Sequence, residues 1–224
     1  MFIVEKDPKS IAAESYRTLR TNLQYSSFDE EYKVIVVTSS EPGEGKSTTA
    51  GNLALSIAQG DKKVALVDCD LRKPSIHKKF GLSNTAGLSD VIVGKEDISI
   101  VGHRYNDNLT VLTSGKIPPN PSEMLASKSM KALIDALKQV FDYVILDTPP
   151  IQAVTDAQIL STRADGTLLV VKAEKTKKES VANSVNLLKK VNANIIGTVL
   201  NGVDSKRSNY YYYYGDKKES ELKK

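Results

Sequence analysis

The sequence predicts an α/β fold, a mainly parallel, twisted sheet flanked by helices. Short apolar runs of strand length alternate along the chain with segments of helical periodicity, and this alternation is typical of βαβ units. The first run, residues 33–38, holds four consecutive β-branched apolar residues and leads directly into a glycine-rich segment, residues 39–45. An uninterrupted apolar run of this kind indicates a strand buried on both faces, as at the centre of a parallel sheet.

The expected elements follow one another in a regular order. A helix is expected over residues 10–26, with Ser10 as its N-cap and apolar residues near one face. A second helix, residues 46–59, ends at Gly60, and apolar spacings of three and four predict another through residues 130–141. Five further strands are expected at residues 63–68, 109–112, 143–146, 167–171 and 195–200.

Composition narrows the class of protein. The chain of 224 residues suits one α/β domain, and its net charge of +4 is too small to indicate nucleic-acid binding. Cys69 is the single cysteine and there are two histidines, so neither a disulfide framework nor a Cys/His zinc site is expected. No apolar run approaches the length of a membrane span, and the N-terminus does not read as a signal peptide, so a cytoplasmic location is expected.

The last part of the sequence differs from the rest. From Asp204 onward no apolar periodicity remains, which predicts a folded domain over residues 1–203 and a flexible tail over residues 204–224. The tail carries five consecutive tyrosines: Tyr210, Tyr211, Tyr212, Tyr213 and Tyr214. Taken alone the run would be a sticky terminus. Following a phosphate-binding loop, it suggests an enzyme that phosphorylates its own tail or that of a neighbour.

That loop has the form G-x-x-x-x-G-K-[ST], with Ser40 in place of the first glycine. Its backbone N–H groups and the start of the next helix can cradle phosphates. Lys46 would hold the β- and γ-phosphates and Ser47 would bind Mg²⁺. An ordinary glycine-rich turn would not need Gly-Lys-Ser at the helix start. The predicted nucleotide-binding residues of the loop are Ser40, Glu41, Pro42, Gly43, Glu44, Gly45, Lys46, Ser47 and Thr48.

Acidic residues follow two of the expected strands. Asp68 and Asp70 end one strand, where alternation points both to the same side if the strand geometry continues. One could hold the metal while the other accepts a proton. Asp147 ends an apolar strand in the manner of a Walker B carboxylate, which orients Mg²⁺. The alternative, solvated acids in a strand-end turn, is about equally consistent with the Asp68 segment alone.

Two further motifs leave alternatives open. Glu14, Arg17 and Arg20 are spaced by three on the first expected helix, and this spacing by itself favours a surface ladder of ion pairs. Asn201 ends the last strand. The side-chain amide of Asn201 could recognise adenine, or the residue could be an ordinary asparagine in the turn after a strand.

Together these segments resemble the bacterial tyrosine kinases of capsular and extracellular polysaccharide synthesis, which belong with the MinD/ParA-like P-loop ATPases. The resemblance covers residues 10–203 and the tyrosine tail. Its motifs are E-x-x-R-x-x-R from Glu14, P-G-E-G-K-S-T from Pro42, V-D-C-D-L-R-K-P from Val67, G-L-S-D-V from Gly87, P-P-N-P-S-E-M-L from Pro118 and V-I-L-D-T-P-P from Val144.

The resemblance implies an ATP- and Mg²⁺-dependent tyrosine kinase of P-loop NTPase fold. It links Asp68 to catalysis beside Lys46, and Asp70 and Asp147 with Ser47 to the metal. It makes Glu14, Arg17 and Arg20 part of a subunit interface, against the ladder that spacing alone favours, and the tyrosine run the site of autophosphorylation between subunits. Glu41 stands where related partitioning ATPases carry a lysine, which disfavours their mechanism.

The resemblance also implies partners. It predicts a homo-oligomer, a separate membrane-spanning activator that brings the chain to the inner face of the membrane, and a tyrosine phosphatase and polysaccharide enzymes as further partners. Two other functions stay open at this point. One is a MinD/ParA-like positioning ATPase, and the other is a non-catalytic scaffold for polysaccharide machinery.

Overall fold

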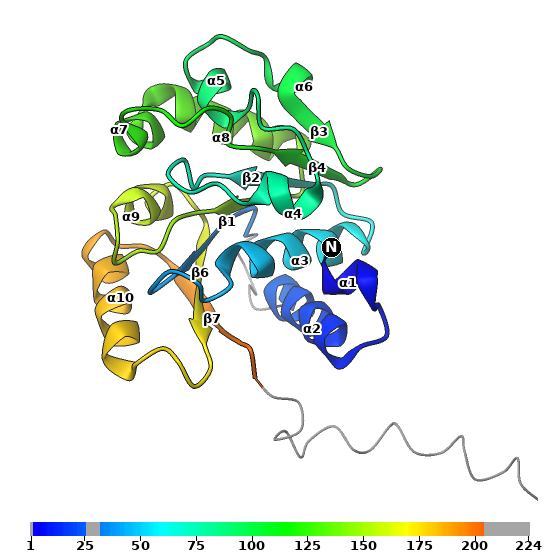
Figure 1. The fold of residues 1–224 in the computed structure, drawn as a ribbon, viewed down its shortest axis with the longest axis vertical. Helices are drawn as coiled ribbons and strands as arrows, with labels where there is room; N and C mark the ends of the chain where they lie inside the picture. The colour runs from blue at the N-terminus through cyan, green and yellow to red at the C-terminus, as the bar shows by residue number, and fades with distance from the viewer. Residues whose placement is uncertain (1, 26–31, 204–224) are drawn as a thin grey trace, which may run out of the picture.

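A seven-stranded sheet forms the centre of the molecule, with strand order β3-β4-β2-β5-β1-β6-β7 (Figure 1). The computed structural model describes residues 2–25 and 32–203. All neighbouring strands are parallel except β3, which runs antiparallel to β4. The predicted α/β fold is therefore confirmed. The strands are β1 Val34–Ser39, β2 Val64–Asp68, β3 Gly102–Arg104, β4 Leu109–Leu112, β5 Tyr143–Asp147, β6 Gly166–Lys172 and β7 Ile195–Asn201.

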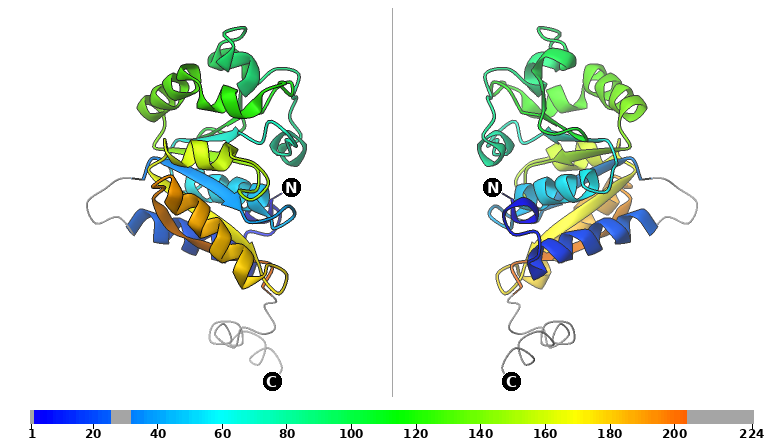
Figure 2. Two further views of the ribbon diagram at one scale, coloured as in Figure 1. Left: turned by 90° about the vertical axis from the view of Figure 1, so that its left-hand side faces the viewer. Right: turned by 90° about the vertical axis from the view of Figure 1, so that its right-hand side faces the viewer.

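Helices cover both faces of the sheet. On one face α3 packs against β1, β2 and β5, and α1 and α2 pack against α3. On the other face α8 packs against β5 and α9 against β1. The two side views show α10 in front from one side and α1 in front from the other (Figure 2). The helices are α1 Ile3–Lys6, α2 Ile11–Tyr25, α3 Lys46–Ala58, α4 Ile76–Phe80, α5 Leu88–Ile92, α6 Ile98–Val101, α7 Pro121–Ala126, α8 Lys128–Val140, α9 Asp156–Ser161 and α10 Lys178–Lys190.

Strand alternation divides the core in two. Ile35 and Val37 of β1 pack with α3 on one face, while Val34 and Val36 pack with α8 and α9 on the other. All four are fully buried. Successive side chains of a strand point to opposite faces, so both faces of β1 need apolar residues along its first four positions. This explains the uninterrupted apolar run in the sequence.

The expected strands agree with the structure to within one or two residues at their ends, whereas β3 was not predicted. This strand is three residues long, Gly-His-Arg, and pairs only with β4 at the sheet edge. A polar segment this short carries no apolar period from which a strand could be inferred. The helix expected over residues 10–26 is present as α2. No described helix combines the length and apolarity needed to cross a bilayer.

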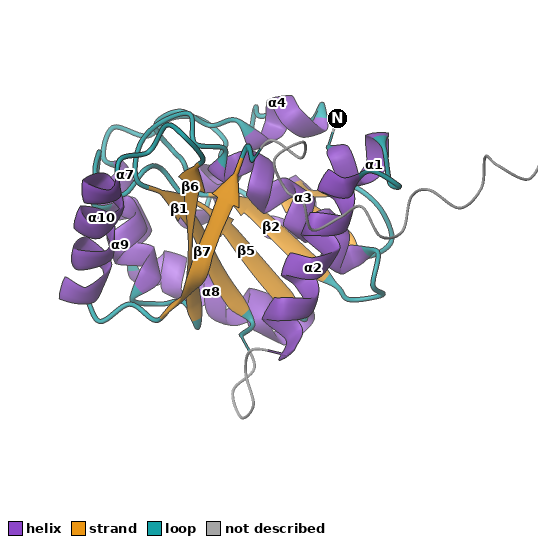
Figure 3. Ribbon diagram, turned by 90° about the horizontal axis from the view of Figure 1, so that it is seen from below, coloured by secondary structure: helices purple, strands orange, loops and turns teal. Residues whose placement is uncertain are grey.

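The carboxyl ends of the parallel strands meet at one edge of the sheet, where loops gather (Figure 3). The strands β2, β5 and β1 are immediate neighbours in the sheet. The loops that follow them therefore lie side by side, although they begin as far apart in sequence as residue 40 and residue 148. Ligand sites of open α/β sheets occur at this edge.

Candidate active site

The loop after β1 has the backbone of a phosphate cradle. Gly43 and Gly45 have φ angles of +81° and +97°, a region that favours glycine. Helix α3 begins directly after Gly45, so its first N–H groups face the same space. A Cβ atom at Gly45 would lie 2.0 Å from Asn201 Nδ2. Position 45 is thus restricted to glycine both by its φ angle and by the close approach of β7.

Hydrogen bonds to the side chains of two glutamates in the loop fix its conformation. Glu44 is 1% exposed, and its carboxylate accepts hydrogen bonds from the Glu41 N–H (3.0 Å) and from the Thr176 hydroxyl. Ser180 donates to the Glu41 carboxylate at 2.7 Å. Asn201 donates from its amide nitrogen to the Glu44 carbonyl at 2.9 Å. These contacts anchor the loop to β7 and to the segment that opens α10, so both glutamate side chains already have partners within the chain.

Three aspartates converge beside the loop. Asp68 and Asp147 are register partners across β2 and β5, and the Cys69 N–H donates to the Asp147 carbonyl at 2.8 Å. Asp70 follows two residues after Asp68 and is 4% exposed. The structure thus brings together the acids that the sequence placed at two strand ends, and their solvated alternative does not hold because Asp68 and Asp147 are fully buried.

Lys46 is the cation among these carboxylates. Its Nζ donates to Asp70 Oδ2 at 2.9 Å and to Ser47 Oγ at 3.2 Å, and it lies 3.8 Å from Asp147 Oδ1. Burial lowers the pKa of Lys46, but the charges of Asp147 and Asp70 outweigh burial and the pKa is raised. The lysine is therefore held as a cation at the position from which it can contact phosphate.

Asp147 is buried, and neither of its carboxylate oxygens has a hydrogen-bond partner among the described residues. Burial raises its pKa, and the Lys46 charge opposes this increase. Lys46 lies 3.8 Å from Asp147 Oδ1, but a buried carboxylate that lacks hydrogen-bond donors is costly unless something further binds it. The orphaned oxygens of Asp147 therefore point to a missing cation.

The residues present fit Mg²⁺. Within the described ranges no group of three or more His, Cys, Asp or Glu side chains could hold a metal ion unaided. Magnesium sites in phosphate-binding proteins need less, because one or two carboxylates combine with substrate phosphates and water. The Ser47 hydroxyl, Asp70 and Asp147 supply such a set around Lys46.

Asp68 has a different environment. Its Oδ1 accepts from the Asp70 N–H (3.2 Å) and its Oδ2 accepts from the N–H groups of Ser75 (3.1 Å) and Ile76 (3.0 Å). Burial, followed by the charge of Asp147, raises the pKa of Asp68 to about 7. A general base is most effective when its pKa lies near the working pH. Asp68 therefore has the properties of a proton acceptor, held in place by backbone donors.

A further contact fixes the loop that carries Asp68 and Asp70. Arg72 donates from Nε and Nη2 to the two carboxylate oxygens of Asp156 at 3.0 and 3.1 Å, and from Nη2 to Ser122 at 2.8 Å. Asp156 is fully buried at the start of α9. This bidentate pair joins the loops that follow β2 and β5. Sequence reasoning missed it because its partners are 84 residues apart.

A pocket of about 580 Å³ opens beside these groups. The volume suits a small ligand such as a nucleotide. It is lined by Pro42, the loop glycines, Lys46, Ser47, Thr48 and Asp70, by Arg72, Lys73, Pro149 and Pro150 of the quoted sequence motifs, and by residues outside those motifs: Ser75, Lys79, Ala153 and Val154. Asp68 and Asp147 are not among the lining residues. Lys79 donates to the Thr48 hydroxyl at 3.0 Å and is a third lysine in the pocket, beside Lys46 and Lys73.

Comparison with known proteins agrees with this geometry. A family model described as a NUBPL iron-transfer P-loop NTPase of the ParA type matches residues 31–222. The tyrosine-protein kinase YwqD of Bacillus subtilis (strain 168) is 47% identical over 216 residues, which cover 96% of this chain and 91% of the relative. The chain belongs to the bacterial tyrosine kinases of the ParA-like P-loop group.

Solved structures support the same family. The kinase domain of the Escherichia coli tyrosine kinase ETK matches this kinase with a TM-score of 0.88 at 36% identity, covering 96% of this chain and 84% of that one. The chimerical protein CapA2B2 matches with a TM-score of 0.85 at 39% identity, covering 89% and 88%. Iron–sulfur clusters need several thiolates, whereas this kinase has the single buried Cys69. The family model therefore matches through the P-loop fold.

The charged residues of the motif on α2 lie in two different environments in this kinase. Arg17 pairs with Glu14 at 2.6 Å and also donates to the Pro8 carbonyl at 2.6 Å, on a face that is partly exposed. Arg20 instead donates to the Ser56 carbonyl of α3 at 2.7 Å. Part of the motif thus fastens α2 to α3, and Glu14 with Arg17 remains accessible to a second subunit. The tyrosine run lies outside the described residues.

Proposed function

We propose that this kinase uses ATP and Mg²⁺ to phosphorylate Tyr210–Tyr214 on a neighbouring copy of the chain. Residues 1–203 would be the kinase unit, and residues 204–224 would be its acceptor segment. The observation that carries the proposal is the orphaned carboxylate of Asp147 beside Lys46, at the end of a phosphate-binding loop. A bound Mg²⁺ would supply positive charge that offsets charge developing on the phosphates.

The chain's own residues would divide the work. The N–H groups of the loop and the start of α3 hold the phosphates, and Lys46 neutralises the group in transfer. Ser47, Asp70 and Asp147 are the residues that hold the metal. Asp68 accepts the proton of the tyrosine hydroxyl, whose ordinary pKa of about 10 leaves it protonated near neutral pH. Asn201 remains a proposed adenine contact: one N–H of its side-chain amide donates to the Glu44 carbonyl, which leaves the oxygen and the second N–H for that role.

Assembly is the second part of the proposal. Glu14 and Arg17 on α2 would contact a neighbouring subunit, and a separate membrane-spanning activator would bring the kinase to the inner face of the membrane. The relatives named for capsular or exopolysaccharide loci, such as the putative kinase CapB of Staphylococcus aureus, support a role in polysaccharide synthesis or export. A tyrosine phosphatase would reverse the modification.

Incubation with ATP and Mg²⁺, with and without a candidate activator fragment, followed by mass spectrometry of the tail, tests the proposal. We expect phosphate on residues 210–214, and more of it with the activator. ATP hydrolysis without any phosphotyrosine in either condition would instead favour a positioning ATPase.

A further inference from the structure

A second hollow lies directly beside the nucleotide pocket. It has a volume of about 670 Å³, and its lining includes Arg72, Lys73, Lys78 and Lys116, together with the apolar side chains of Pro74 and Ile117. We call it the basic groove. Arg72, Lys73 and Ser75 line both the groove and the nucleotide pocket, so the two hollows are continuous along the loop that follows β2.

The groove has a fixed frame. One wall is residues 72–78, and the other is the segment after β4. Asn84 joins the walls: its Nδ2 donates to the Gly115 carbonyl at 3.0 Å, and its Oδ1 accepts from the Gly115 N–H at 3.0 Å. Gly115 has a φ angle of +72°, and a Cβ there would lie 2.5 Å from Asp90. The lysine at position 116 is therefore presented from a constrained turn.

The positive charge of the groove is not balanced within it. No aspartate or glutamate lines it, and within residues 2–25 and 32–203 no ion pair includes Lys73, Lys78 or Lys116. Arg72 is the exception, because Asp156 already binds it. Glu123, which is exposed, and Asp70 are further acids outside the groove whose charges act on Arg72. The groove thus offers three lysine ammonium groups to an anion.

In the proposed reaction, each tyrosine of the tail that becomes phosphorylated is such an anion. Each phosphorylation adds about −1.5 to −2 charges, next to a pocket that is lined by Asp70 and would hold the phosphates of the nucleotide. Neighbouring residues of an extended chain are about 3.3–3.6 Å apart, so a modified tyrosine remains close to the pocket while the next one enters. Without a cationic partner, the new charge would be repelled.

We propose, in an inference that rests on the proposed function, that the basic groove binds phosphotyrosines already formed on the tail of a second copy of the chain. The phosphate contacts Lys73, Lys78 and Lys116, and the aromatic ring packs on Pro74 and Ile117. Three ammonium groups balance about two phosphotyrosines. The groove therefore acts as a holding site that lets one tail receive several phosphates before it leaves.

Peptide binding tests the groove without requiring transfer activity. A fluorescent peptide of residues 206–218, carrying either no phosphate or two phosphotyrosines, is titrated with the full chain and followed by anisotropy. Saturating ADP and Mg²⁺ keep the phosphotyrosines out of the P-loop. We expect the doubly phosphorylated peptide to bind about tenfold or more tightly than the unmodified one, since charged hydrogen bonds to phosphate replace contacts with water.

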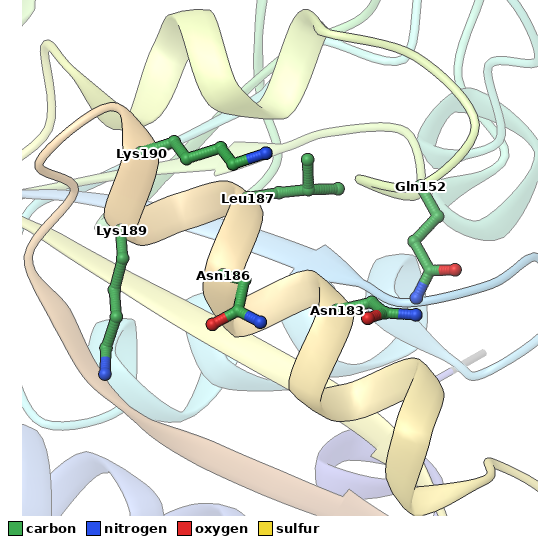
Figure 4. A pocket seen from close by; sticks show the side chains of 6 residues that line it. All are labelled: Gln152, Asn183, Asn186, Leu187, Lys189 and Lys190. Atoms are coloured by element: carbon green, nitrogen blue, oxygen red, sulfur yellow. The ribbon is translucent and has the colours of Figure 1, made fainter.

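A double variant separates the groove from general charge. Lys78→Gln with Lys116→Gln changes residues that line the groove and not the nucleotide pocket, and we expect it to remove most of the preference for phosphate. The control, Lys189→Gln with Lys190→Gln, makes the same change in charge in a hollow on α10 (Figure 4), where it should leave binding unchanged. Equal affinity for both peptides, or an equal loss in both variants, would overturn the proposal. Because no phosphate is transferred, absence of kinase activity would leave this result intact.

Discussion

The P-loop and helix α2 both carry charged residues that sequence motifs singled out, but the fold treats them in opposite ways. In the loop, Lys46 and Glu44 are enclosed and have partners within the chain. On α2, Arg17 and Glu14 pair with each other on a face where their side chains are 30% and 53% exposed. The loop is thus held by contacts within its own subunit, whereas the Glu14–Arg17 pair on α2 remains partly exposed.

This difference shows what an isolated chain can and cannot specify. Enclosed charges need partners close by, because an unpaired buried group costs several kcal/mol. Exposed ion pairs contribute at most about 1 kcal/mol and can be exchanged for contacts with a neighbour. Substitutions in the loop should therefore change chemistry or stability, and those at Arg17 should change assembly alone.

The largest effect is expected for Lys46→Met. Removing the cation from the phosphate site should lower the rate of tyrosine phosphorylation about 100-fold or more, as for loss of other groups that stabilise the transition state. Quantitative mass spectrometry of the tail over time measures the rate. Lys189→Met, an exposed lysine on α10, is the matched control and should keep the rate of the unchanged chain. Undiminished phosphorylation in Lys46→Met would refute the assigned site.

The two buried acids should separate into two roles. Asp147→Asn should weaken Mg²⁺-dependent ATP binding about tenfold or more, the effect typical of groups that orient a metal through its ligands. Asp68→Asn should slow transfer more than it weakens binding. ATP titrations with and without Mg²⁺, beside phosphorylation rates, measure both quantities. Equal losses of affinity in the two variants would contradict the division.

The support behind the loop should appear as stability. Thr176→Val removes a donor from the buried Glu44 carboxylate, which should lower the free energy of unfolding by about 1–3 kcal/mol. For a domain of this size the melting temperature should fall by roughly 2–4 °C for each kcal/mol. Thr18→Val makes the same substitution at an exposed position of α2 and should have little effect. Similar melting temperatures for both variants would count against the role given to Glu44.

The smallest change in stability is expected for a substitution on α2. This substitution tests the difference between the enclosed charges of the P-loop and the exposed charges of α2. Arg17→Glu removes a partly exposed pair with Glu14 and an exposed hydrogen bond to the Pro8 carbonyl, so the melting temperature should change little while the mass of an oligomer measured by light scattering falls. Arg20→Ala breaks the contact with Ser56 and should destabilise the monomer by about 1 kcal/mol. If the oligomer keeps its mass in Arg17→Glu, the Glu14–Arg17 pair is an ordinary surface ion pair and not part of a subunit interface.

The sequence predicted those features that depend on residues close to one another in the chain. Strands such as Val34–Ser39 and Val64–Asp68 were predictable because burial on both faces requires continuous apolar runs, and the P-loop was predictable because its glycines and lysine are consecutive. The rule that ligand sites lie at the carboxyl ends of strands placed Asp68 and Asp147 at the same edge of the sheet, whereas their direct juxtaposition comes from the pairing of β2 with β5, which the structure supplies.

Contacts between distant segments were beyond prediction from spacing. The partners of Arg72 and Arg20 lie 84 and 36 residues away, and helical periodicity relates a residue only to others on its own helix. The same limit applies to Asn201, whose contact with the Glu44 carbonyl depends on how β7 passes the P-loop. Such pairings are set by the packing of whole elements.

The orphaned carboxylate of Asp147 has a consequence for how long the protein survives in a cell. A chain without nucleotide carries a buried carboxylate that has no hydrogen-bond donor and only the Lys46 charge, 3.8 Å away, to offset it. A ligand that binds only the folded form raises the stability of that form by mass action. Chains deprived of ATP and Mg²⁺ should therefore open more often and be cleaved sooner by proteases. The lifetime of the protein would then follow the energy supply of the cell.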